Sequence, residues 1–159
     1  MKELSKKSPY WLPKDRFMEL KYFVKQIRYF QEKYEEVLYS KAGGYLVHWD
    51  NSRIQRLDKL KNDPTAQKAI QGSIYKGYLD EIMQAKRALK EFVTSRGDDE
   101  DVYLCVITAA VCDASYDTVQ GNYIHMDKVV PVSRKRFYQY LRYFYWYLDC
   151  VKTHNLPTS

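Results

Sequence analysis

Residues 133–152 read SRKRFYQYLRYFYWYLDCVK. Its apolar residues recur at intervals of four, three, four and three, which is the spacing of one stripe along an α-helix. The stripe consists of Phe137, Leu141, Phe144, Leu148 and Val151. Ser133 has an N-cap side chain, and Pro131 ends whatever precedes it. We therefore predict a helix that begins at residue 133 or 134 and turns this stripe towards the core.

The first turn of this helix carries three cations, Arg134, Lys135 and Arg136. The positive end of the helix macrodipole disfavours each of them by about 0.3–1 kcal/mol. A bound polyanion is the simplest functional explanation for such a breach of a local rule, and it makes this a candidate recognition helix. The alternative is that the cations are exposed and screened by water, as in many helices without a ligand.

The length and composition indicate one globular domain that needs neither disulfides nor metals. No apolar run approaches the length of a membrane span, and the N-terminus lacks the apolar segment of a signal peptide, so we expect a cytoplasmic protein. The three cysteines, Cys105, Cys112 and Cys150, are odd in number and form no C-x-x-C pair. They are expected to be reduced, buried thiols.

The net charge of +6 is unevenly distributed. Residues 1–97 carry 20 basic and 12 acidic side chains, residues 98–132 carry 1 and 7, and residues 133–159 carry 5 and 1. An acidic segment thus directly precedes the basic helix. This layout would orient the protein on a polyanion, or would form a self-complementary patch in an oligomer.

The chain up to residue 97 is predicted to be mainly helical. Residues 1–13 look like a basic tail whose end docks through Tyr10, Trp11 and Leu12. An apolar stripe from Lys14 to about Ser40 predicts one long helix, and Gly43 and Gly44 end it. Residues 41–63 are either a loop or contain a short helix after Ser52.

Asp63 and Pro64 mark the start of a second helix, which continues to about Arg96. Its interior glycines, Gly72 and Gly77, either permit a close helix contact or mark a bend.

Residues 98–152 have the order of a helix-turn-helix unit. Four acidic residues precede an apolar segment from Val102 to Cys112, which is a buried helix or a core strand, with helix favoured by the acidic start. A short helix after Ser115 and the basic helix would then follow. The connection, residues 121–132, exceeds the turn of about three or four residues that such a unit needs. Either the short helix extends into it, or a loop or hairpin is inserted there.

The predicted fold class is therefore all-α, with four or five helices and a C-terminal helix-turn-helix-like unit. After the basic tail, residues 14–159 would form a single helical domain. Residues 14–97 would be its scaffold and residues 98–152 its helix-turn-helix-like part.

No catalytic or metal-binding pattern is found. The three histidines, His48, His125 and His154, are scattered, and there is no glycine-rich phosphate loop and no metal-spaced set of ligands. We predict a non-enzymatic protein without a cofactor.

Eight aromatic residues lie around the basic helix, too many for one buried stripe: Phe137, Tyr138, Tyr140, Tyr143, Phe144, Tyr145, Trp146 and Tyr147. Some of them are therefore expected to meet another surface. Tyr138 would contact phosphate or bases in a DNA complex. Tyr145, Trp146 and Tyr147 would pack in a homodimer or against a partner protein. The two interpretations are compatible, since helix-turn-helix proteins commonly bind DNA as dimers.

Several segments resemble small prophage-encoded proteins of Gram-positive bacteria. They are residues 12–23, 63–66 with Ala69 and Ile70, 115–117, 130–133 with Phe137 and Tyr138, and 144–148. The C-terminal part is similar to phage late-gene regulators of the ArpU and RinA type. This resemblance implies a sigma-region-4-like or helix-turn-helix C-terminus and a location in the cytoplasm of a bacterial host.

We therefore predict a phage-type transcriptional regulator that binds double-stranded DNA through the helix 133–152. The expected DNA-binding residues are Ser133, Arg134, Lys135, Tyr138, Gln139 and Arg142, with Arg136 reaching the backbone only. The alternative is a helical protein that interacts with partners in phage assembly, replication or packaging.

Overall fold

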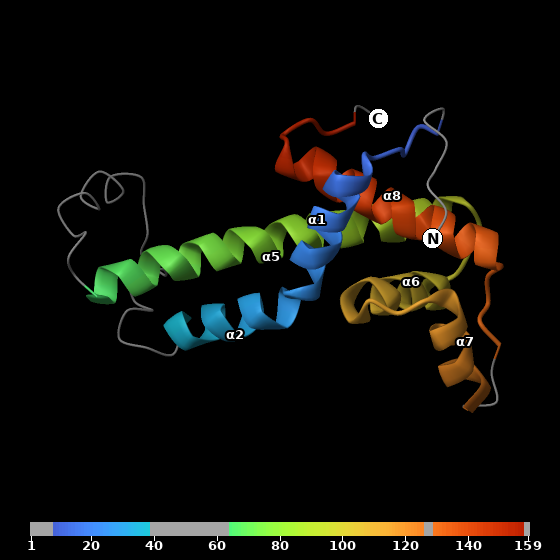
Figure 1. Cartoon of the computed structure of the whole chain (residues 1–159), viewed down its shortest axis with the longest axis horizontal. Helices are drawn as coiled ribbons and strands as arrows, with labels where there is room; N and C mark the ends of the chain where they lie inside the picture. The colour runs from blue at the N-terminus through green and yellow to red at the C-terminus, as the bar shows by residue number, and fades with distance from the viewer. Residues whose placement is uncertain (1–7, 39–63, 126–128, 158–159) are drawn as a thin grey trace. The chain divides into compact units, whose positions relative to one another are not determined.

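The computed structural model describes residues 8–38, 64–125 and 129–157, and every regular element in them is helical (Figure 1). The predicted all-α class is confirmed. These residues form six helices rather than the predicted four or five: α1 (Lys14–Lys25), α2 (Ile27–Leu38), α5 (Pro64–Ser95), α6 (Glu100–Cys112), α7 (Tyr116–His125) and α8 (Arg134–Lys152). The undecided segment 41–63 lies outside the described residues.

The predicted long helix from Lys14 to about Ser40 is wrong, because α1 ends at Lys25 and α2 begins at Ile27. No glycine or proline marks this break at Gln26. The chain also changes compact unit here. Unit 1 comprises Met1–Lys25 and Glu81–Ser159, and unit 2 comprises Gln26–Asp80. The interruption therefore coincides with the boundary between the two units and has no local breaker.

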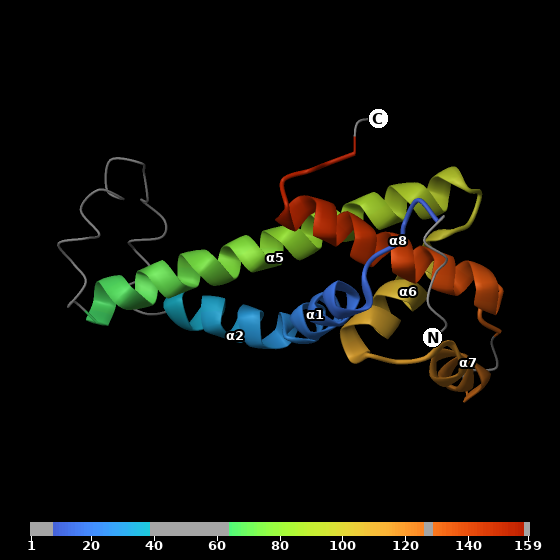
Figure 2. The ribbon, with the colours of Figure 1, turned by 45° about the horizontal axis from the view of Figure 1, so that its top comes forward.

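The core of unit 1 is built around α8. All five residues of the predicted stripe are buried, and so are Tyr140 and Tyr145 beside it. Figures 1 and 2 show α1, the C-terminal part of α5 and α6 around this helix. Leu20 and Val24 of α1 are buried in the same unit. The sequence period of α8 thus correctly predicted which of its faces is covered.

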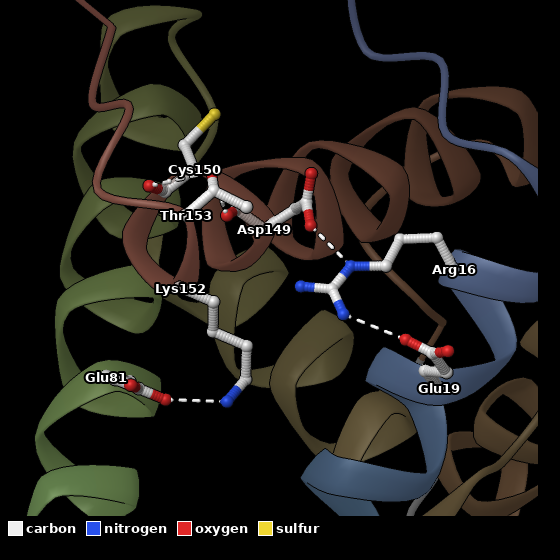
Figure 3. A network of polar contacts seen from close by, with 7 residues as sticks. All are labelled: Arg16, Glu19, Glu81, Asp149, Cys150, Lys152 and Thr153. Atoms are coloured by element: carbon white, nitrogen blue, oxygen red, sulfur yellow. Dashed lines mark hydrogen bonds and ion pairs between the residues drawn. The ribbon is translucent and has the colours of Figure 1, made fainter.

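The C-terminal end of α8 is held by polar contacts with two other helices (Figure 3). Arg16 Nε of α1 donates to Asp149 Oδ1 at 2.6 Å, and its Nη1 lies 2.8 Å from Glu19 Oε2. Lys152 Nζ donates to Glu81 Oε2 of α5 at 2.7 Å. The same ammonium group lies 3.4 Å from the centroid of the Phe23 ring. This end of α8 is therefore an anchored part of the fold.

The chain before α1 docks on unit 1 through Tyr10, as predicted. The Tyr10 ring contacts the rings of Phe92, Tyr143 and Trp146 edge-on, at centroid distances of 5.8, 5.2 and 5.1 Å. Phe92 of α5 in turn stacks on Tyr143 with centroids 4.0 Å apart. Aromatic groups from three segments thus cover one side of α8.

The apolar segment before residue 113 forms the helix α6, as favoured by its acidic start. Asp99 caps this helix by accepting a hydrogen bond from the Val102 N–H group. The three cysteines are free, but only Cys105 is buried. Cys112 is exposed, which corrects the prediction of buried thiols. Because it is the last residue of α6, the cover over Cys105 does not extend to it.

Unit 2 contains α2 and the first half of α5. Phe30 of α2 lies against the rings of Tyr75 and Tyr78 of α5, at centroid distances of 5.9 and 5.1 Å. Gly72 faces Val37, and a Cβ atom at Gly72 would come within 2.8 Å of Val37 Cγ1. Of the two roles proposed for this glycine, the close helix contact is therefore the one observed.

No single helix among the described residues is both long and apolar enough to cross a membrane. The helices α6 and α7 reach the required length and composition only when taken together, and the chain bends by 119° between them.

Candidate nucleic-acid interface

The N-terminal end of α8 begins where the sequence predicted it. Ser133 is the N-cap, with extended backbone angles, and its Oγ accepts a hydrogen bond from the Arg136 N–H group at 3.3 Å. The next three residues, Arg134, Lys135 and Arg136, all have exposed side chains. This cap therefore fixes the point from which three cations project at the edge of unit 1.

Two of these cations are paired with carboxylates from other segments. Arg134 makes a two-pronged contact with Asp117 of α7, with Nη1 3.1 Å from Oδ2. This contact raises the pKa of the Arg134 guanidinium from its ordinary value. Arg136 Nη1 lies 3.4 Å from Asp98 Oδ2, just before α6. The sequence predicted three uncompensated charges, and for Arg134 and Arg136 that prediction is wrong.

Lys135 and Gln139 have no such partner. Both are exposed, and neither makes a hydrogen bond or an ion pair with any residue that the structure describes. They lie one turn apart on α8, so they share a face of the helix. Together with Arg134 and Arg136 they are the exposed residues of α8, and all four lie in its first two turns.

The structure separates Tyr138 and Arg142 from this exposed group. Tyr138 is half-buried, and its hydroxyl oxygen accepts a hydrogen bond from the Tyr116 N–H group at 3.2 Å. Arg142 is also half-buried, and burial lowers the pKa of its guanidinium. Of the six predicted DNA-binding residues, Ser133, Arg134, Lys135 and Gln139 thus lie together in solvent, whereas Tyr138 and Arg142 lie further inside.

The start of α7 is fixed to the start of α8 by residues that were not among the predicted DNA-binding residues. The Tyr116 hydroxyl donates to the Val132 carbonyl oxygen at 2.9 Å, and the Arg134 guanidinium lies 5.3 Å from the centroid of the Tyr116 ring. With the Asp117 contact, these interactions join α7 to α8 across the connecting residues 126–133. In Figures 1 and 2, α7 lies beside α6 and near the beginning of α8. Only the position of Asp117 in the first turn of a predicted helix gave any signal of this contact.

The hydroxyl of Tyr140 contacts the carboxylate that pairs with Arg136 at the N-terminal end of α8. It donates to the Asp98 carboxylate, which also accepts from Arg136. Burial and this contact raise the pKa of Tyr140 to about 12. Asp98 is therefore held between a buried hydroxyl and an exposed cation.

The aromatic residues of α8 meet other parts of the same chain. Tyr145 contacts Phe17 of α1 at a centroid distance of 5.1 Å, and Tyr140 contacts Phe92 of α5 at 5.7 Å. Trp146 contacts Tyr10, as described above. Tyr145 and Trp146 are thus covered by rings from other segments of unit 1, whereas the Tyr147 ring contacts Tyr143 and Trp146 of the same helix. The predicted homodimer stays a prediction.

Comparisons with models of known protein families, with curated proteins and with solved structures find no match. Within the described ranges, no three histidine, cysteine or acidic side chains are grouped so that they could hold a metal ion.

Proposed function

We propose that this chain is a double-stranded-DNA-binding protein of the helix-turn-helix type, and that the first two turns of α8 contact DNA phosphates. One observation carries the proposal: the exposed residues of α8 are three cations and an amide, all at one end. Beyond Gln139 every residue of α8 is buried or half-buried. The basic end is therefore the part of this helix that a polyanion can reach.

The ion pairs at this end leave the cations available to a ligand. The side chains of Arg134 and Asp117 are 58% and 64% exposed, and water screens such a pair strongly. A DNA phosphate offers the arginine the same two-pronged geometry as a carboxylate. It also gains from the release of condensed counterions, which a carboxylate on the same protein does not. Exchange of Asp117 for a phosphate is therefore favourable at low salt.

We assign this DNA binding to transcriptional regulation of the phage type. The support comes from the sequence, whose C-terminal part resembles phage late-gene regulators. The location of such a protein would be the cytoplasm of the bacterial host, where the DNA lies.

Fluorescence anisotropy with a mixed-sequence duplex tests the proposal over a series of salt concentrations. We expect the affinity to fall steeply as salt rises, because cations displace counterions from the phosphates. The Arg134→Ala/Lys135→Ala variant should bind more weakly, and the slope of log K against log salt should become shallower by about two.

The matched control is Lys33→Ala/Lys76→Ala, which removes the same charge from exposed positions of unit 2. It should bind like the wild type. Loss of binding in both variants would indicate that overall charge, rather than this end of α8, attracts DNA. Absence of DNA binding by the wild-type protein at low salt would refute the proposal.

The second candidate function is docking of a partner protein in an assembly role. It is favoured by exposed aliphatic side chains in the same part of the chain: Leu104, Ile124 and Val129 are 48%, 61% and 76% exposed. A partner protein that covered these side chains would remove their apolar surface from water. A Leu104→Ser/Ile124→Ser variant that keeps DNA binding and loses a partner would favour this candidate.

A further inference from the structure

We propose that α7, and not α8, is the helix that reads base pairs, so that α6 and α7 form the helix-turn-helix. This inference rests on the proposed DNA binding and assigns the parts of the same site. A helix-turn-helix needs a turn of about three or four residues between helices at about 90–120°. The chain between α6 and α7 is residues 113–115, and the bend between the two helices is 119°. Between α7 and α8 lie residues 126–133, which is too long for that turn.

The turn between α6 and α7 is tightly defined by backbone contacts. Asp113 has a left-handed backbone with φ of 52°, and its N–H group donates to the Ala109 carbonyl oxygen. The Ala114 N–H group donates to the same oxygen at 2.9 Å. Ser115 then receives the Thr118 N–H group on its Oγ at 3.2 Å and so caps α7. The angle between the helices is thus fixed at both ends of the turn.

One face of α7 packs against other residues of unit 1. Tyr116 and Val119 are buried, and Cys105 Sγ of α6 lies 2.8 Å from the Tyr123 hydroxyl. That contact, with burial, raises the pKa of Tyr123 to about 12, so this phenol stays neutral. The contacts of Tyr116 and Asp117 with the start of α8 hold the N-terminal end. A helix fixed on one side in this way can enter a groove as a rigid body.

The face of α7 that carries Thr118, Gly121 and Asn122 is open, and two of these residues have side chains that can bind base edges. Thr118 and Asn122 are exposed and lie one turn apart, and Gly121 lies between them. A Cβ atom at Gly121 would meet nothing within 4 Å, so the backbone there can approach a ligand closely. An asparagine amide can bind adenine through two hydrogen bonds, and a threonine can bond a base edge or contact a thymine methyl group. Both side chains can therefore contribute to readout in the major groove.

The cations of α8 then take the second role in the same complex. Arg134 lies beside the N-terminus of α7, and Lys135 follows it on the exposed end of α8. In a helix-turn-helix complex, phosphate contacts next to the reading helix fix its register, and they carry no sequence information themselves. In this complex α7 therefore recognises the DNA sequence, and α8 adds affinity through phosphate contacts.

Selection of duplexes from a randomised pool separates the two roles. The full chain and three variants are compared: Thr118→Ala/Asn122→Ala on α7, Gln139→Ala on α8, and Arg134→Ala/Lys135→Ala on α8. We expect the α7 variant to lose about tenfold or more in preference for the selected site, with its affinity for mixed DNA unchanged. The Gln139 variant should keep the preference, and the double cation variant should lose affinity equally for all sequences.

A second pair of substitutions tests docking of the open face without removing any existing side chain. Gly121→Gln and Gly121→Glu place groups of the same size in open space, so both variants should fold like the wild type by circular dichroism. Only the glutamate brings negative charge to DNA, and it should weaken binding at least tenfold relative to the glutamine.

The outcomes distinguish this inference from the proposed function. If the wild type binds no DNA, both fail. If the wild type binds DNA but selects no sequence, or if Gln139→Ala alone changes the selected site, the α7 assignment fails and DNA binding by the basic end stands. Equal DNA affinity of Gly121→Gln and Gly121→Glu would equally refute docking of this face.

Discussion

At the scale of single residues, two carboxylates compensate the positive charge at the basic end of α8. Asp117 and Asp98 come from segments that the sequence separates from α8 by 17 and 38 residues, and they pair with Arg134 and Arg136. A local rule about charges in a first helical turn cannot include such partners. The cations are tolerated at the helix start for this reason. In the proposed DNA complex, the same carboxylates would compete with the phosphates for the two arginines.

The Asp117→Asn substitution tests that competition. It removes the negative charge while keeping the side-chain shape, so Arg134 loses its partner and becomes fully available to phosphate. We expect DNA affinity to rise several-fold at low salt, and the thermal unfolding temperature to change little because the pair is exposed. Asp15→Asn, at an exposed position of α1, removes the same charge elsewhere and serves as control. Equal gains in the two variants would mean that only net charge matters.

The Asp113 carboxylate is paired with two lysines of α1. It lies 3.0 Å from Lys25 Nζ and 3.1 Å from Lys21 Nζ, and these bonds lower its pKa from the ordinary value. A carboxyl group with a lowered folded-state pKa adds stability that is fully present above its unfolded-state pKa, and loses it as the pH falls through the folded-state pKa.

The Asp113→Asn variant should therefore be less stable than the wild type at neutral pH, by at most about 1 kcal/mol since the groups are partly exposed. The difference should shrink below about pH 4 and vanish once Asp113 is protonated in the folded protein. Asparagine tolerates the left-handed backbone of this position, so the comparison isolates the charge. Urea unfolding at several pH values measures it, and a difference that is constant down to pH 2 would contradict the pairing.

At the scale of elements, the sequence predicted what depends on local pattern. The stripe of α8, the start of α5 at Pro64 and the acidic start of α6 all follow from spacing and capping, and all three are confirmed. The break at Gln26 was missed because residues 25–27 contain no glycine or proline. The end of α7 at His125 resolved an alternative that the sequence left open, in favour of an extended short helix. The prediction of uncompensated charges on Arg134 and Arg136 was wrong because their partners come from distant segments.

The contribution of the N-cap of α8 to stability can be tested by substitution of Ser133. Ser133→Ala removes the acceptor for the Arg136 N–H group at the helix start and should lower the free energy of unfolding by about 1 kcal/mol. Ser133→Asp keeps an acceptor and adds a charge that suits the helix N-terminus, so it should be at least as stable as the wild type. Thermal unfolding followed by circular dichroism measures both. If alanine and aspartate had the same effect, the cap would not contribute.

At the scale of the whole molecule, the division into two compact units raises the question of how cooperatively the chain unfolds. Proteins open locally in cooperative groups that often coincide with structural units. Unit 1 can be perturbed at Tyr10, whose ring contacts three other aromatic rings. Unit 2 can be perturbed at Gly72, where a methyl group would collide with Val37. Gly77, on the same helix as Gly72, offers a control because a Cβ atom there meets nothing within 4 Å.

We expect Gly72→Ala to reduce amide hydrogen-exchange protection in α2, because overpacking against a β-branched side chain costs about 1–3 kcal/mol. Gly77→Ala should instead increase stability by up to about 1 kcal/mol, through helix propensity alone. Tyr10→Ala should reduce protection in α6 and α8 and leave α2 largely unchanged, since the lost ring contacts all belong to unit 1. If either variant lowered protection equally in α2 and α8, the two units would unfold as one. The basic end of α8 could then not be separated from the stability of unit 2 by mutation.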